Sequence, residues 1–257
     1  MIVRGLEVDF VGRTVCVANQ KGGVGKTTTA VNLASCLAMS GCLTLVVDLD
    51  PQCNATSNLG WEPEGRHALV GSQTIRESIV ETEVENLHLL RGSRNVADIE
   101  VLATGGVESD ALRQHLTSGL ATYDFVLIDC PPSLGQLTQS ALGASTEVLM
   151  PIQCEYFAME GLTQMIHVIR RVMQQYPGRL DFGGILLTMY DDKLELAHEV
   201  DREVREFFGE IVYDVSIPRD VAVAEAPSHG KSVIDYAPRA RGTRAYIELC
   251  MEVLNRE

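Results

Sequence analysis

The feature that most constrains the fold is a glycine-rich turn that joins a short apolar run to an amphipathic segment. Residues 15–18 are apolar and predict a buried strand, and residues 30, 33, 34 and 37 are apolar at helical spacing. Between them, residues 21–28 read Lys-Gly-Gly-Val-Gly-Lys-Thr-Thr. Glycines let backbone N–H groups converge on an anion, and a helix N-terminus adds unsatisfied donors and a positive dipole. The order of strand, glycine loop and helix therefore predicts a site for a phosphate.

The turn departs from the common P-loop pattern G-x-x-x-x-G-K-[ST]. Gly25, Lys26 and Thr27 match the end of that pattern, but Gln20 stands where its first glycine belongs. By this chemistry Lys26 reaches the β- and γ-phosphates and the Thr27 hydroxyl holds Mg²⁺. An extra lysine, Lys21, leads into the loop and is placed to reach the γ-phosphate of its own chain or of a neighbouring one. The nucleotide-binding candidates in the loop are Lys21, Gly22, Gly23, Val24, Gly25, Lys26, Thr27 and Thr28.

Two further apolar runs end in carboxylates. Residues 43–47 lead to Asp48 and Asp50, and residues 123–128 lead to Asp129. Asp48 and Asp50 flank one leucine, so they point to the same side of the strand end, where ligands of α/β proteins bind. A carboxylate at Asp50 suits the activation of water. An apolar strand that ends in Asp129 has the Walker B arrangement, in which the carboxylate accepts from a Mg²⁺-bound water or from the loop hydroxyl.

Composition limits the class of protein. The chain has 257 residues and a formal net charge of −14, from 35 acidic and 21 basic residues. That balance argues against a surface that is basic overall, although a local patch could bind nucleic acid. Seven cysteines without a C-x-x-C pair indicate reduced thiols. There is no apolar run of about 18 residues and no leader peptide, so we expect a soluble, cytoplasmic protein.

The strands alternate with helices, and no repeat or linker divides the chain. This pattern predicts one doubly wound α/β domain over residues 1–257, with a mostly parallel sheet and helices on both faces. Residues 1–13 are expected to be a short lead-in strand or extension. The other expected elements are helices at 74–80, 110–120, 161–176 and 241–255 and strands at 87–92, 149–152 and 183–190. Residues 61–118 contain no motif that predicts chemistry, and His67, His88 and His115 are expected to be surface or partly buried residues.

The glycine loop, with its second lysine, resembles the deviant Walker A motif of the ParA/MinD group of ATPases. Three other segments are similar to motifs of that group: residues 48–56 to switch I, residues 151–161 to P-x-Q-x-E-x-x-A-x-E-G, and residues 217–227 to I-P-R-N-x-x-x-x-E-A-P. Residues 131–132 resemble part of switch II. The resemblance covers residues 14–254 and is closest to the ParA/Soj branch.

The resemblance implies an ATP-sandwiched homodimer that binds Mg²⁺ and hydrolyses ATP slowly until a ParB-like partner stimulates it. In that dimer Lys21 reaches the phosphates of the partner, Asp50 orients the attacking water and Asp48 lies near the Mg²⁺ shell. Glu155 is a candidate contact on the dimer side of the nucleotide. The catalytic candidates are therefore Lys21 and Asp50, and the metal candidates are Thr27, Asp48 and Asp129.

The resemblance also implies that Pro218 and the residue at position 220 hold the adenine. Asp220 stands where the group has asparagine. An aspartate accepts a hydrogen bond from the adenine amine but donates none to a ring nitrogen unless it is protonated. The preference for adenine is therefore less defined than the binding of phosphate.

Soj-like proteins bind DNA without sequence preference through basic residues in two places. The first is the loop after Tyr190, where this chain has Lys193 among acidic neighbours. The second follows the I-P-R motif, where this chain has Ala222. Each lost phosphate contact weakens DNA binding and its salt dependence. The remaining basic candidates are Arg219, Lys231, Arg239, Arg241 and Arg244.

Two functions fit these observations. The first is a partitioning ATPase that acts on chromosomes or plasmids through non-specific DNA binding. The second is an ATP-switched regulatory or cargo-positioning protein that binds a protein partner with little DNA affinity, which Ala222 and the net charge of −14 favour. Relatives of the MinD type dock on membranes through a basic C-terminal helix, whereas residues 246–257 carry acids, so no membrane partner is expected.

Overall fold

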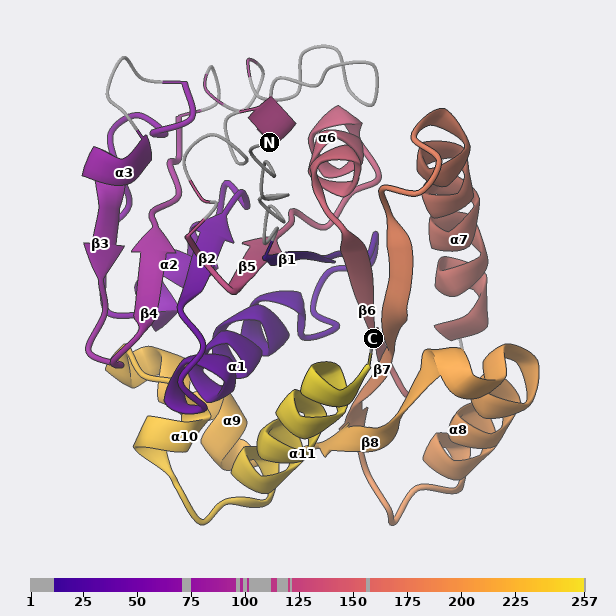
Figure 1. The fold of residues 1–257 in the computed structure, drawn as a ribbon. Helices are drawn as coiled ribbons and strands as arrows, with labels where there is room; N and C mark the ends of the chain where they lie inside the picture. The colour runs from indigo at the N-terminus through magenta and orange to yellow at the C-terminus, as the bar shows by residue number, and fades with distance from the viewer. Residues whose placement is uncertain are drawn as a thin grey trace, which may run out of the picture.

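The computed structural model describes residues 12–70, 75–95, 98, 101, 112–114, 120, 122–155 and 158–256, with the side chains of 158–160 excepted. Within that part of the chain, one eight-stranded sheet has the strand order β3-β4-β2-β5-β1-β6-β7-β8. Every pair is parallel except β3 with β4. The predicted doubly wound, mostly parallel sheet is confirmed (Figure 1). The predicted lead-in at 1–13 and the predicted helix at 110–120 lie mostly outside the described residues.

The strands are β1 (Arg13–Val17), β2 (Thr44–Asp48), β3 (Ile79–Glu81), β4 (Leu87–Leu90), β5 (Phe125–Asp129), β6 (Glu147–Gln153), β7 (Asp181–Tyr190) and β8 (Val212–Pro218). The longer helices are α1 (Lys26–Met39), α6 (Gln136–Ala144), α7 (Ala158–Gln175), α8 (Glu195–Phe208) and α11 (Arg241–Asn255). The shorter ones are α2 (Asn54–Asn58), α3 (Ile75–Ser78), α9 (Val221–Glu225) and α10 (Val233–Tyr236), with 3₁₀ turns at Gly209–Ile211 and Ala226–His229. None of the helices described here is long and apolar enough to cross a membrane.

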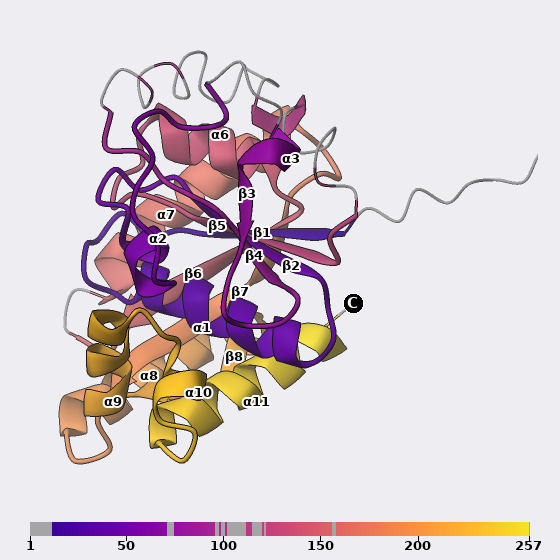
Figure 2. The same cartoon turned by 90° about the vertical axis from the view of Figure 1, so that its left-hand side faces the viewer.

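Helices cover both faces of the sheet, as Figure 2 shows for α1 and α11 on one side and α6 on the other. Successive strand residues point to opposite faces. In β1, Val15 and Val17 belong to the apolar cluster that includes residues of α1 and α11, whereas Cys16 belongs to the cluster on the other face, with residues of α6, α7 and α8. The central strands β1, β2 and β5 are apolar on both faces, as buried parallel strands are. Because these strands are parallel, the carboxyl ends of β1, β2 and β5 lie at the same end of the sheet.

The structure differs from the sequence-based prediction at residues 74–80. The predicted helix is only one turn, α3, and Ile79 and Val80 begin strand β3, which pairs antiparallel with β4. A run of so few residues has no periodicity that separates helix from strand, and the pairing with β4 decides its conformation. Helix α8 and strand β8 were not predicted either.

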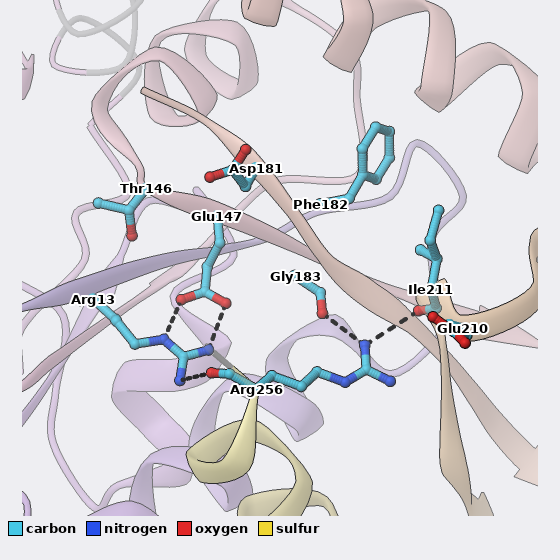
Figure 3. A pocket seen from close by; sticks show the side chains of 9 residues that line it. All are labelled: Arg13, Thr146, Glu147, Asp181, Phe182, Gly183, Glu210, Ile211 and Arg256. Carbon is cyan, nitrogen blue, oxygen red and sulfur yellow. Dashed lines mark hydrogen bonds and ion pairs between the residues drawn. The ribbon is translucent and has the colours of Figure 1, made fainter. Parts of the chain in front are cut away.

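An open hollow of about 590 Å³, shown in Figure 3, lies at the amino-terminal ends of β1, β6 and β7. The Arg13 guanidinium donates to both Glu147 oxygens, at 2.6 and 2.8 Å, and to the Val253 and Arg256 carbonyls. Arg256 in turn donates to the carbonyls of Gly183, Ile211 and Val212. Most N–H groups of both guanidiniums already have acceptors, so these arginines tie residues 253–256 to the sheet, and the hollow does not resemble an anion site.

Replacing Glu147 by alanine is expected to lower the free energy of unfolding by about 2–4 kcal/mol, because Arg13 would remain half-buried without its carboxylate. Urea unfolding measures this change. Glu199→Ala, which removes an exposed glutamate of α8, is the control and should change stability by less than about 0.5 kcal/mol. Equal effects of the two substitutions would contradict a structural role for the pair.

Candidate nucleotide-binding site

Strand register brings the predicted carboxylates together at the carboxyl edge of the sheet. Val17, which ends β1, and Asp48, which ends β2, both pair with Asp129 at the end of β5. The glycine loop leaves β1 at this edge and leads into α1 (Figure 1). The loop and the carboxylates are therefore neighbours, although they come from three separate strands.

The loop has the backbone geometry that glycine permits. Gly23 and Gly25 have φ values of +74° and +88°, in the left-handed region that strains residues with a side chain. Gly25 is the N-cap of α1, whose first turn contains no acidic residue. The N-terminus of α1 therefore presents its free N–H groups to the loop, where an anion would be stabilised.

Lys26 is almost completely buried under the loop. Its ammonium donates to the Lys21 carbonyl at 2.9 Å. Burial lowers the Lys26 pKa, while the charges of Asp129 and Asp50 oppose that shift. The Thr188 hydroxyl of β7 donates to the Val24 carbonyl at 2.9 Å and so fastens the loop to the sheet.

Lys21 lies at the rim, in contrast to Lys26. Its backbone N–H donates to the Asn19 side chain, and its ammonium lies 3.0 Å from the Glu155 carboxylate. The two side chains of this ion pair are 40% and 47% exposed. An exposed pair of this kind contributes only about 0–1 kcal/mol, so it holds Lys21 weakly.

Asp129 and Asp48 form a pair of fully buried carboxylates. One oxygen of Asp129 accepts from the Thr27 hydroxyl at 2.8 Å, and the other, Oδ1, is buried without a hydrogen-bond partner. Burial raises the pKa of Asp48 to about 6. Burial also raises the pKa of Asp129 well above its usual value, and repulsion by the Asp48 charge adds to this shift. A free carboxylate oxygen beside a hydroxyl is a donor set that Mg²⁺ prefers. The residues present therefore fit this ion.

The Asp48 carboxylate has backbone and side-chain partners of its own. It accepts from the Thr56 N–H and hydroxyl, at 2.8 and 2.6 Å, and from the Asp50 N–H at 3.2 Å. Asp50, 6% exposed, accepts from the Gln52 N–H at 2.9 Å. Asp50 lines the hollow over the loop, whereas Asp48 lies behind it.

Two hollows adjoin at this edge. The first, about 420 Å³, is lined by the loop residues 22, 23 and 25–28, by Asp50 and by Pro132. The second, about 320 Å³, includes Pro218 and Asp220 in its lining. They share Gly25, Thr28 and Met189. Their sizes are those of small-molecule sites, and one has phosphate-binding groups while the other has apolar walls.

Asp220 has a structural role that the sequence analysis missed. Its carboxylate accepts from the Ala222 N–H at 3.0 Å and so caps α9, and it accepts from the Gly242 N–H at 2.8 Å in α11. An aspartate directly before a helix is an N-cap signal that could have revealed the first contact. Its predicted contact with the base stays a prediction.

The basic candidates for DNA are exposed. Arg241 donates to the Arg219 carbonyl at 3.4 Å, which brings the end of β8 and the start of α11 together. Lys193 lies in the loop before α8, where its backbone N–H donates to Asp191. None of these cations has an ion-pair partner among the residues that the structure describes. The exposed set is Lys193, Arg219, Lys231, Arg239, Arg241 and Arg244.

His67, which was expected to be a surface or partly buried residue, is 2% exposed. Its ring contacts the Asp48 carbonyl at 3.1 Å. That expectation was wrong because the contact joins residues 19 positions apart and has no local sequence signal.

Comparisons with known proteins agree with this geometry. A family model described as an AAA domain matches residues 12–182. The sporulation initiation inhibitor protein Soj of Bacillus subtilis is 43% identical, with 95% of this chain and 98% of Soj covered. The chromosome partitioning protein ParA of Myxococcus xanthus is 44% identical, with 96% and 89% covered.

Solved structures extend the likeness to the fold. Cobyrinic acid a,c-diamide synthase of Mycobacterium smegmatis, with bound ADP and magnesium, has a TM-score of 0.80 at 32% identity over 95% of this chain and 94% of that one. The cell division ATPase MinD of Pyrococcus furiosus has a TM-score of 0.78 at 25% identity, with 95% of this chain and 98% of that one covered. The chain therefore belongs to the ParA/MinD family of deviant P-loop ATPases, in its ParA/Soj branch.

Proposed function

We propose that this protein is a Mg²⁺-dependent ATPase that dimerises on ATP, is reset by hydrolysis and acts in chromosome or plasmid partitioning. The observation that carries the proposal is that Lys26, Thr27 and Asp50 line one hollow, with Asp129 bonded to Thr27, beside a second, base-sized hollow. Relatives named as chromosome partitioning proteins, at 42–44% identity, support the biological role. The proposed location is the cytoplasm, and the nucleoid if DNA is bound.

In the proposed mechanism the loop N–H groups and Lys26 bind the phosphates. Thr27 and Asp129 would hold Mg²⁺, which would neutralise charge on the β- and γ-phosphates. Asp48, which pairs with Asp129 in the register of β2 and β5, would add negative potential near the metal. Asp50 accepts a hydrogen bond from the attacking water and orients it toward the γ-phosphate. Pro218 and Asp220 contact the adenine from the second hollow.

Dimerisation is proposed to bring Lys21 of each chain to the phosphates of the other. Its exposure at the rim and its weak pairing with Glu155 leave its ammonium free to exchange partners. Glu155 then faces the partner's nucleotide. Hydrolysis is proposed to be slow alone and to be stimulated by a ParB-like protein.

DNA binding is proposed to use the exposed arginines around Arg219 and Arg241. Random duplex DNA is expected to bind Asp50→Ala protein with ATP and Mg²⁺ but not with ADP, and binding should weaken steeply with salt. Arg219→Ala/Arg241→Ala should reduce the salt slope by about 2, since each phosphate contact contributes about 1. The control is Arg170→Ala/Arg171→Ala, which removes two exposed arginines of α7.

The second candidate function is an ATP-switched protein that binds a protein partner. The net charge of −14 and the acidic neighbours of Lys193 favour it. Absence of DNA binding at low salt, with the ATP dimer present in the same sample, would favour this candidate and contradict the partitioning proposal.

A further inference from the structure

We infer that His67 is a positioning residue for hydrolysis: it fixes Asp48, and through Asp48 the loop that carries Asp50, without touching the nucleotide. The inference rests on the ATPase function proposed above. It concerns a segment, residues 61–70, in which the sequence shows no catalytic motif.

The hydrogen bonds of His67 define its tautomer. Its Nδ1 accepts from the Leu69 N–H at 3.2 Å, so in the neutral ring the proton is on Nε2. Nε2 then donates to the Asp48 carbonyl at 3.1 Å. The His67 N–H donates to the Asp98 carboxylate at 2.6 Å, which holds the backbone of His67 in place. All three bonds are buried, so the ring has one defined orientation.

Asp48 transmits this constraint to the loop that contains Asp50. The carboxylate of Asp48 accepts from Thr56, after the loop, and from the Asp50 N–H inside it. The Asp48 carboxylate therefore holds the loop at Asp50 and again at Thr56, while His67 holds the backbone carbonyl of Asp48. A small displacement of a positioned catalytic group is enough to reduce a rate strongly.

Gly92, at the end of β4, closes the same cluster. Its N–H donates to the Thr56 hydroxyl at 2.9 Å. A Cβ at this position would lie 2.9 Å from Cγ of Asp48 and 3.0 Å from Sγ of Cys53. The Thr56 hydroxyl thus accepts from Gly92 and donates to Asp48, and the cluster leaves no room for a side chain at position 92.

Three substitutions of His67 separate its two ring contacts. The amide of glutamine reaches the place of Nε2 and can donate to the Asp48 carbonyl, so His67→Gln should keep kcat within about 2-fold of the parent. Asparagine is shorter; its oxygen can replace Nδ1 but its amide cannot reach Asp48. His67→Asn and His67→Ala should therefore lower kcat by about 10-fold, while the Kd for ATP and Mg²⁺ stays within about 2-fold.

Thr56 gives a second pair of variants for the same cluster. Thr56→Val removes the hydroxyl at nearly constant shape and should also lower kcat by about 10-fold with little change in Kd, whereas Thr56→Ser should resemble the parent. All rates are measured well below the unfolding temperature of each variant. This choice separates loss of positioning from loss of folded protein.

A parent rate in both His67→Asn and Thr56→Val would overturn the inference and leave the proposed function intact. Equal losses of kcat in His67→Gln and His67→Asn would also overturn it, because the Asp48 contact would then be irrelevant. A parent chain that neither binds nor hydrolyses ATP would contradict the proposed function itself.

Discussion

Replacing Asp50 by alanine is expected to lower the ATP turnover number by at least about 100-fold, because this removes the carboxylate that we propose orients the attacking water. Asp50 lines the hollow over the loop. One of its oxygens accepts from the Gln52 N–H, and the other accepts no bond from the described part of the chain. That free oxygen is the acceptor that we assign to the water.

The same substitution should leave ATP binding within a few-fold of the parent, since Lys26, Thr27 and the loop N–H groups are unchanged. Phosphate release measures turnover, and titration with a fluorescent ATP analogue measures affinity. Asp181→Ala, which removes an exposed carboxylate at the opposite edge of the sheet, is the matched control and should keep the parent rate. Turnover at the parent rate in Asp50→Ala would show that another group positions the water.

Asp129→Asn is expected to have two opposite effects. It should weaken Mg²⁺-dependent ATP binding by at least about 10-fold, because an amide nitrogen cannot take the place of the free carboxylate oxygen beside Thr27. It should also stabilise the nucleotide-free protein at pH 8 by about 1–3 kcal/mol, because it removes one of two buried, mutually repelling charges. Asparagine keeps the shape of the site and still accepts from Thr27.

The pH dependence follows from the raised pKa values of Asp48 and Asp129. A carboxyl whose pKa is higher in the folded state binds protons more tightly there. Its stabilising contribution is complete below the unfolded-state value of about 4 and is lost as the pH rises through the folded value, about 6 for Asp48. The nucleotide-free parent should therefore gain stability from this pair as the pH falls from 8 to 6, and Asp129→Asn should show less of this gain.

Thermal unfolding at pH 6 and pH 8, with and without ATP and Mg²⁺, checks both effects. The parent should gain unfolding temperature from ATP and Mg²⁺ at pH 8, and Asp129→Asn should gain much less. If the variant were less stable than the parent at pH 8 without nucleotide, the account of the buried carboxylate pair would be wrong.

Sequence reasoning succeeded where neighbours in the chain determine the structure. The strand at 15–18, the helix after the glycine loop and the helix at 241–255 are found as β1, α1 and α11. Their apolar spacing and the glycines of the loop are local signals. The strands that end in Asp48 and Asp129 were also recognised, because a buried parallel strand is apolar along its whole length.

The cluster behind Asp50 could not be predicted in this way. His67 contacts Asp48 over 19 positions, and Gly92 contacts Thr56 over 36. Only the order of the strands, which places β4 beside β2, brings these residues together. Strand β3 was missed for the same reason, because its conformation depends on its pairing with β4.

The most direct test of the account is the molar mass of Asp50→Ala in solution, measured by light scattering with ATP and Mg²⁺ and again with ADP. We expect twice the 28.1 kDa of one chain with ATP and a single chain with ADP. Adding Lys21→Ala should return the ATP sample to a single chain while ATP still binds, since Lys21 is proposed to act across the interface. A single chain at saturating ATP, with the nucleotide shown to be bound, would contradict the central claim that ATP joins two copies of this protein.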